Sequence, residues 1–175
     1  RIIGLGVEKV SVSAAALAQP ALLTEMAAAI GRQSVVAVLD VRKKAGFFSK
    51  GYEVCTHNAK QMYKLDPIAL VQQLQSAGAG EIVINAIDRD GEMQGYDIDL
   101  ARQVRAAVKV PLTILGGAGS LAHMGELFTA CGVVGAAAGS LFVFKGPYRA
   151  VLINYPGTAQ KDELCRAALA GARTI

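Results

Sequence analysis

Short apolar segments alternate with longer amphipathic segments along this chain, and that alternation constrains the fold more than any other feature. Polar or glycine-rich residues follow each apolar segment, and each longer segment carries apolar residues at the i, i+3, i+4, i+7 spacing of a helix. The predicted strands lie at residues 7–13, 34–41, 81–87, 111–117 and 133–140, and the predicted helices lie near 20–30, 66–78, 97–108 and 120–131. Strict alternation of this kind predicts an α/β fold with a parallel sheet.

Such a sheet is either doubly wound or closed into a (β/α)₈ TIM barrel. The later units repeat at a regular length, and polar residues cluster just after each strand, where barrel active sites lie. The first strand lacks a Gly-x-Gly-x-x-Gly, and "GGAGS" at 116–120 lacks the lysine of a P-loop. Five strands cannot close an eight-stranded barrel. The sheet is therefore open, or the chain is a fragment, and the start "RIIGLGVEKV" without Met favours a fragment lacking the first three units.

Composition narrows the class of protein. The 175 residues are 53% hydrophobic, enough for the core of a single domain spanning residues 1–175. The net charge of +4 comes from scattered Lys and Arg residues, which favours anionic small substrates over nucleic acid. No apolar run is long enough to span a membrane. We therefore expect a cytoplasmic protein with neither nucleic acid nor membrane as a partner.

The cysteines and histidines predict neither a metal site nor a disulfide framework. Cys55, Cys131 and Cys165 are odd in number and widely spaced, and His57 and His123 are the only histidines. Free thiols fit a reducing cytosol. Neither histidine is expected to be catalytic.

The connection over residues 42–64 is much longer than the others. Alternating residues on both sides of "SKG" at 49–51 predict a small hairpin. Loops of this length above a barrel mouth often act as lids, and the alternative is a solvated excursion.

Carboxylates follow two of the predicted strands. Asp40 lies near the end of "SVVAVLDV". A charged group at this position is either a general acid or base, or an acid that caps a loop or pairs with Arg42 or Lys43. Asp88 and Asp90 follow the next strand, with Gly91 permitting a turn. Further along, the acids at 97 and 99 are predicted to cap a helix.

Glycine and serine begin two successive helices, in "LGGAGS" at 115–120 and "AAAGS" at 136–140. Backbone N–H groups at helix starts bind anions, and the last two loops of a barrel are its usual phosphate position. Either motif alone is weak, because tight strand–helix turns use glycine anyway. The pair on consecutive units predicts a phosphate site.

With Asp40, "INAIDRDG…GYD", "LGGAGS" and "AAAGSLFVF" in this order, the chain resembles the cyclase subunit of imidazole glycerol phosphate synthase, the HisF family. The resemblance covers nearly the whole chain and corresponds to the last five βα units of that barrel. It implies a lyase of histidine biosynthesis that needs no cofactor. A partner glutaminase, HisH-like and bound as a heterodimer, supplies ammonia through the barrel. The ammonia meets a phosphoribulosyl-formimino aminoimidazole carboxamide ribonucleotide, which is converted to imidazole glycerol phosphate and the aminoimidazole carboxamide ribonucleotide.

The resemblance also assigns roles to residues. In the family two aspartates act as acid and base, and Asp40 matches the one on the fifth strand; the other would precede Arg1, so this chain alone is expected to be inactive. The remaining matches are a phosphate site at Gly117, Gly139 and Ser140, a substrate path at Asn85, Asp90 and Gly91, and a ring of charges around the ammonia entrance at Lys9 and Glu81.

Some residues depart from the family pattern. Ser13-Ala14 stands where the second phosphate loop usually has Asn-Thr, which leaves Ser13 as its remaining hydroxyl. Leu115 replaces a usual Ser, and "GYEVCTHNAKQ" looks more like the cyclase-like paralogues of surface-polysaccharide clusters. Two alternatives therefore stay open: a paralogue that passes ammonia to a sugar amidotransferase, and a non-catalytic scaffold that conducts ammonia.

Overall fold

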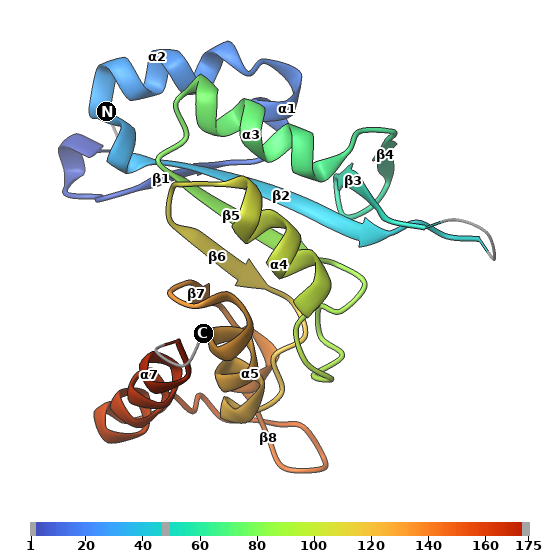
Figure 1. The fold of residues 1–175 in the computed structure, drawn as a ribbon, viewed down its shortest axis with the longest axis vertical. Helices are drawn as coiled ribbons and strands as arrows, with labels where there is room; N and C mark the ends of the chain where they lie inside the picture. The colour runs from blue at the N-terminus through green and yellow to red at the C-terminus, as the bar shows by residue number, and fades with distance from the viewer. Residues whose placement is uncertain (1–2, 47–49, 173–175) are drawn as a thin grey trace.

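A parallel sheet forms the centre of the molecule. The computed structural model describes residues 3–46 and 50–172. Strands β1 (Val10–Val12), β2 (Val35–Lys43), β5 (Glu81–Ala86), β6 (Leu112–Leu115) and β7 (Gly135–Ala136) run parallel and lie in that order. Figure 1 shows the strands side by side, with the helices that connect them around the sheet. This arrangement confirms the α/β prediction and corresponds to part of a (β/α)₈ barrel.

The two faces of the sheet differ in burial, because successive side chains of a strand point to opposite faces. Leu39, Ile84 and Ile114 belong to the face that packs under the helices, and each is at most 1% exposed. The opposite face carries Asp40 and Asn85, which are only partly buried. The polar pair therefore lies on the face that a closed barrel turns inward.

Four amphipathic helices cover the apolar face, close to their predicted positions: α2 (Ala21–Ile30), α3 (Pro67–Ala77), α4 (Ile98–Ala107) and α5 (Leu121–Cys131). A glycine with positive φ follows α2, α3 and α5, at Gly31, Gly78 and Gly132. The helices α3, α4 and α5 each begin with a side-chain cap: an oxygen of Asp66, Asp97 or Ser120, respectively, accepts a backbone N–H of the first turn. These caps fix where the chain returns to the sheet.

The predicted hairpin is present. The second half of β2 pairs antiparallel with β3 (Tyr52–Thr56), with Asp40 opposite Cys55 and Lys43 opposite Tyr52. A second turn at residues 57–60 leads into β4 (Gln61–Tyr63), which pairs with β3. Residues 47–49, which include part of the predicted turn, lie outside the described residues. Whether the hairpin acts as a lid stays a prediction.

The C-terminal part of the fold departs from the sequence prediction. The strand predicted at 133–140 is reduced to Gly135–Ala136, because the chain leaves the sheet to begin the short helix α6 (Ser140–Val143). A two-stranded hairpin of β8 (Phe144–Lys145) and β9 (Ala150–Val151) follows, and then α7 (Thr158–Ala172), which packs against α5. The short helix α1 (Ala14–Ala18) after β1 was also not predicted.

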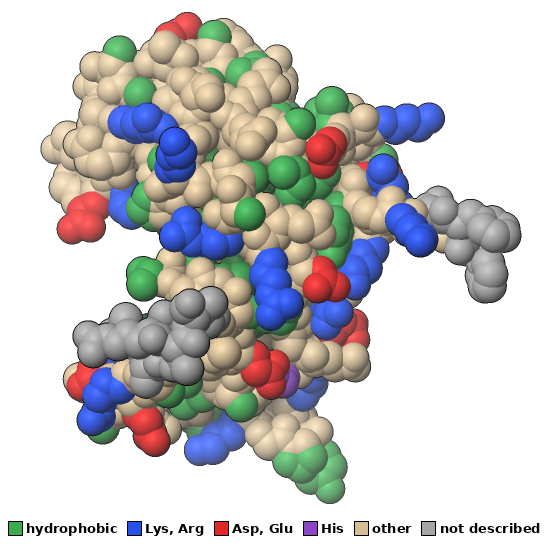
Figure 2. Space-filling view, viewed as in Figure 1, with side chains coloured by type: hydrophobic (Ala, Val, Ile, Leu, Met, Phe, Trp, Pro, Cys, Tyr) green, Lys and Arg blue, Asp and Glu red, His purple; other side chains and the backbone are tan. Residues whose placement is uncertain are grey.

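Charges of both signs are interspersed on the face shown in Figure 2, with no stripe of one sign. This agrees with the scattered Lys and Arg residues of the sequence. Within the described residues, no helix is both long enough and apolar enough to cross a membrane.

Candidate functional site

Strands β2 and β5 place Asp40 and Asn85 directly opposite each other near the C-terminal edge of the sheet. Asn85 Nδ2 donates a hydrogen bond of 3.0 Å to Asp40 Oδ1. The other end of this amide, Asn85 Oδ1, is buried and has no hydrogen-bond partner among the described residues. The pair therefore offers a carboxylate held by one amide N–H, with an acceptor oxygen beside it that a ligand donor can use.

The alternative partners proposed for Asp40 are engaged elsewhere. Arg42 Nε donates to Glu53 Oε1 at 3.0 Å, and Lys43 Nζ lies 3.4 Å from Asp97 Oδ2. The prediction that Asp40 pairs with Arg42 or Lys43 is therefore wrong, because both cations bind other carboxylates. The Asp40 carboxylate is left with Asn85 as its hydrogen-bonded partner in the described part of the chain.

Cys55 lies beside Asp40 on the neighbouring strand β3. Its Sγ donates to the backbone oxygen of Asp40 at 3.5 Å, and the side chain is fully buried. Burial raises the pKa of the Cys55 thiol, and the negative charge of Asp40 raises it further. The thiol therefore stays protonated near neutral pH, which suits packing rather than nucleophilic chemistry.

The turn after β5 carries Asp88, Asp90 and Gly91. Asp88 Oδ2 accepts the backbone N–H of Lys43 at 3.3 Å, so this acid supports the hairpin. Asp90 is exposed and forms no hydrogen bond within the described residues. Gly91 has a φ of +80°, and its carbonyl oxygen accepts from Arg149 Nη2 at 2.7 Å. Asp90 and Gly91 thus lie on the rim of the sheet edge, and neither bonds to Asp40.

The loop after β6 contains Gly117, which is buried rather than facing solvent. Its φ is +100°, and a Cβ at this position would overlap the carbonyl oxygen of Gly95. Gly95 N–H donates to Gly117 O at 2.7 Å, so the two loops are joined through their backbones. Close packing of loops therefore explains this glycine without a ligand.

The loop after β7 is different. Gly139 is exposed, and a Cβ there would meet no atom within 4 Å. It precedes α6, whose first residue is Ser140, and no side chain caps this helix start. At the same edge Ser13 precedes α1, also without a side-chain cap bond. The N–H groups and hydroxyls around Gly139, Ser140 and Ser13 are therefore available to an anion.

Lys9 and Glu81 lie at the N-terminal edge of the sheet, away from Asp40. Lys9 Nζ binds Glu81 Oε2 at 2.6 Å, and Thr113 Oγ1 donates to Glu81 Oε1 at 3.0 Å. The two charges are therefore paired with each other rather than separately solvated.

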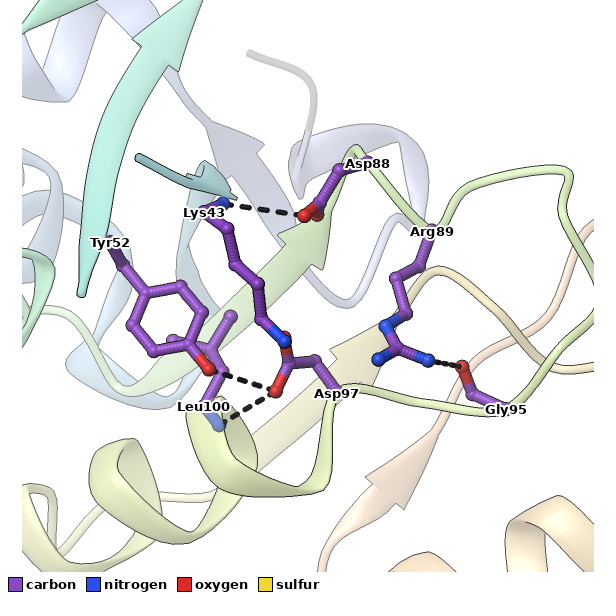
Figure 3. A network of polar contacts seen from close by, with 7 residues as sticks. All are labelled: Lys43, Tyr52, Asp88, Arg89, Gly95, Asp97 and Leu100. Carbon is purple, nitrogen blue, oxygen red and sulfur yellow. Dashed lines mark hydrogen bonds and ion pairs between the residues drawn. The ribbon is translucent and has the colours of Figure 1, made fainter. Parts of the chain in front are cut away.

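Sequence reasoning missed a cluster around Asp97 (Figure 3), which it identified only as a helix cap. Tyr52 hydroxyl donates to Asp97 Oδ1 at 2.9 Å, and the N–H of Leu100 donates to the same oxygen at 3.0 Å. Burial acts to raise the pKa of Asp97, but these hydrogen bonds and the charge of Lys43 outweigh it, so the pKa is lowered. Burial and the bond to Asp97 raise the pKa of Tyr52. No sequence pattern links residues so far apart along the chain.

The histidines serve local contacts. His123 Nδ1 accepts the N–H of Gly119 at 3.1 Å, and His57 Nδ1 lies 2.9 Å from Thr56 Oγ1. Across residues 3–46 and 50–172, no group of three His, Cys, Asp or Glu side chains could hold a metal ion.

Comparison with known proteins gives a consistent result. A family model described as "Histidine biosynthesis protein" matches residues 1–148. "Putative imidazole glycerol phosphate synthase subunit hisF3" of Vibrio vulnificus is 50% identical over 163 residues, which are 93% of this chain and 62% of that protein. "Putative imidazole glycerol phosphate synthase subunit HisF" of Leptospira borgpetersenii is 45% identical over 164 residues, 94% of this chain and 64% of that protein. "Imidazole glycerol phosphate synthase subunit HisF" of Thermobifida fusca is 39% identical over 146 residues, 82% and 57% respectively. The chain therefore spans between 57% and 64% of the length of these relatives.

Proposed function

The chain belongs to the histidine biosynthesis protein family, and from that premise we propose that it serves as the cyclase subunit of an imidazole glycerol phosphate synthase. The proposed reaction combines ammonia with phosphoribulosyl-formimino aminoimidazole carboxamide ribonucleotide and yields imidazole glycerol phosphate and aminoimidazole carboxamide ribonucleotide. The observation that carries the proposal is the Asp40–Asn85 pair at the C-terminal edge of the sheet, where family barrels place their catalytic groups.

In this proposal Asp40 acts as a general acid or base. A carboxylate in that role must reach the reacting atoms and exchange a proton with them. Asp40 is partly buried, its neighbouring cations bind other acids, and its Oδ1 is held by Asn85, which leaves Oδ2 for the substrate. Asn85 Oδ1 accepts from a substrate N–H or O–H, and Asp90 and Gly91 line the path at the rim.

The phosphate groups of the substrate bind at the starts of helices in the proposed complex. Gly139 and Ser140 offer an uncapped helix start with open space in front of it, and Ser13 offers a hydroxyl at the same edge. Gly117 contributes by letting its loop approach the loop at Gly95 rather than by facing the phosphate. The resemblance implies a reaction without a cofactor, and none is proposed.

Ammonia enters from the opposite edge in the proposed mechanism. The Lys9–Glu81 pair lies at the N-terminal end of β5, and we assign it to the entrance that a glutaminase subunit covers in a heterodimer. The Thr113 bond holds Glu81 in place at this end. The curated relatives reported above are named as synthase subunits, which does not favour the alternative of sugar amidation.

The test is product formation from the ribonucleotide and an ammonium salt, using the protein in the form that the cell makes. We expect imidazole glycerol phosphate from the wild type and none from Asp40→Asn, with substrate binding retained. No product from the wild type, with stimulation of the glutaminase intact, would reject the cyclase. It would leave the two alternatives, the paralogue that passes ammonia to a sugar amidotransferase and the ammonia-conducting scaffold.

A further inference from the structure

Strands β2 and β5 separate just beyond the Asp40–Asn85 pair, and beyond that point a side-chain hydrogen bond connects the two segments in place of the backbone ladder. Their register ends at Val41 and Ala86, where the N–H of Ile87 still donates to Val41 O at 3.0 Å. β2 then continues into the hairpin, while β5 turns away. The Asp88 carboxylate accepts the N–H of Lys43 at 3.3 Å and so holds the diverging strand to the turn.

The hairpin is also fixed to the other end of the β5–α4 loop. Lys43 and Tyr52 face each other across β2 and β3, and both side chains reach Asp97, one at 3.4 Å and the other at 2.9 Å (Figure 3). The Asp97 side chain is 3% exposed and Tyr52 is partly buried, whereas the Lys43 side chain reaches Asp97 from the surface and stays 51% exposed. The hairpin base is therefore bound to both ends of the same loop.

Helix capping alone does not explain this arrangement. A cap requires one carboxylate oxygen to accept one N–H, which the N–H of Leu100 provides at 3.0 Å. The Tyr52 hydroxyl and the Lys43 ammonium are additional, and burying a carboxylate is costly unless such partners are present. These additional contacts come from the hairpin, and they lie three residues along β2 from Asp40.

We propose that Tyr52 and Asp97 are positioning residues for the reaction, whose contacts with Lys43 hold the hairpin so that β2 presents Asp40 to Asn85 in its productive orientation. The inference rests on the proposed function. Small displacements of a catalytic group reduce turnover strongly, whereas substrate binding at the distant helix starts does not depend on the hairpin. Loosening the cluster should therefore lower kcat and leave KM nearly unchanged.

The test compares Tyr52→Phe with Tyr63→Phe. Tyr63 lies in β4 of the same antiparallel extension, and its hydroxyl has no hydrogen-bond partner in the described residues, so its substitution controls for loss of a phenol. We expect Tyr52→Phe to lower kcat about tenfold with KM within about twofold, and Tyr63→Phe to change neither. Asp97→Asn keeps an oxygen for the Leu100 N–H but removes the negative charge, and like Tyr52→Phe it should lower kcat.

Hydrogen exchange of the β3 amides separates positioning from simple stabilisation. Faster exchange in β3 together with the fall in kcat supports the inference. Faster exchange with wild-type kcat overturns the inference, since the cluster would then only stabilise the hairpin. An unchanged kcat together with unchanged exchange also overturns it. If the wild type itself forms no product, the proposed function fails, and the positioning role fails with it. Turnover in the wild type with no loss in Tyr52→Phe rejects the positioning role alone.

Discussion

Substitutions at Gly117 and Gly139 should have different consequences: at Gly117 they lower stability, whereas at Gly139 a large side chain weakens substrate binding and leaves stability nearly unchanged. Both glycines follow strands at the C-terminal edge of the sheet, and the sequence resemblance predicts a phosphate site at both. At Gly117 a Cβ would overlap Gly95 O and lie 3.3 Å from Arg89 Cβ, whereas at Gly139 it would meet nothing within 4 Å. The same change of one methyl group therefore tests two different environments.

The cost at Gly117 has three sources. A φ of +100° is unfavourable for an L side chain by roughly 1 kcal/mol or more. Forcing the two loops apart costs roughly 1–3 kcal/mol, as overpacking does elsewhere. Separating them also weakens the Gly95–Gly117 backbone hydrogen bond of 2.7 Å, a loss of about 1 kcal/mol. We expect Gly117→Ala to lower the free energy of unfolding by at least about 3 kcal/mol, the lower bound of these contributions.

Thermal unfolding measures the difference. For a domain of this size about 3 kcal/mol corresponds to a fall in Tm of about 6–12 °C. Gly139→Ala should change stability by no more than about 0.5 kcal/mol, because φ is −102° and the site is open. The larger Gly139→Val should raise KM for the phosphorylated substrate by filling the space in front of the helix start, with Tm nearly unchanged.

A Gly117→Ala variant with the Tm of the wild type would refute the loop-packing argument. An unchanged KM in Gly139→Val would remove Gly139 from the phosphate site. A large fall in Tm for Gly139→Ala would show that this glycine is needed for folding, and the two positions could no longer be distinguished.

Three other outcomes are expected. Asp40→Asn should abolish cyclisation and leave the Kd for the ribonucleotide nearly unchanged, which calorimetry and product analysis measure together; unchanged turnover would exclude Asp40 from the mechanism. Glu81→Gln should reduce glutamine-dependent turnover more than ammonium-dependent turnover, since the Lys9 pair lies at the proposed ammonia entrance; equal effects on both would contradict that assignment. Because the pKa of Asp97 is lowered in the folded protein, its ionisation stabilises the fold above about pH 4, and this contribution is lost as the pH falls through the folded pKa. In urea titrations Asp97→Asn should therefore have a lower free energy of unfolding than the wild type at pH 7, and this free energy should fall less than that of the wild type on acidification. The same fall in both proteins would refute that reasoning.

The strands and covering helices were predictable because their signals are local. Apolar runs and helical periodicity depend on neighbouring residues, and the glycines after α2, α3 and α5 mark helix ends through backbone conformation alone. Asp40 was also identified, because a carboxylate at the end of an apolar strand is unusual in any context. Its hydrogen bond with Asn85 depends on the parallel register of β2 and β5, which only the fold provides.

Other features could not be inferred in this way. The strand predicted at 133–140 contains mostly Val, Gly and Ala, and this pattern did not show that the chain leaves the sheet after Ala136 and begins a helix at Ser140. The helix α7 had a usable signal, since Ala, Leu, Glu and Lys are strong helix formers. It follows the short β8–β9 hairpin rather than a strand of the parallel sheet, and so lies outside the repeating pattern. The Asp97 cluster joins residues 43, 52 and 97, whose proximity depends on the hairpin and the loop together.

The glycine motif after β6 was correctly identified as a place that requires glycine, but the structure gives a reason other than phosphate binding. A Cβ at Gly116 would press against Ala86 O, one at Gly117 against Gly95 O, and one at Gly119 against Met93 O. The three glycines therefore face the backbone of the last residue of β5 and of the loop that follows it, and "GGAG" is explained by the close packing of these two neighbouring segments. The open space expected of a ligand site lies one unit later, at Gly139 and Ser140. If phosphate binds at this edge, its affinity should depend on the second motif directly and on the first only through the stability of the rim.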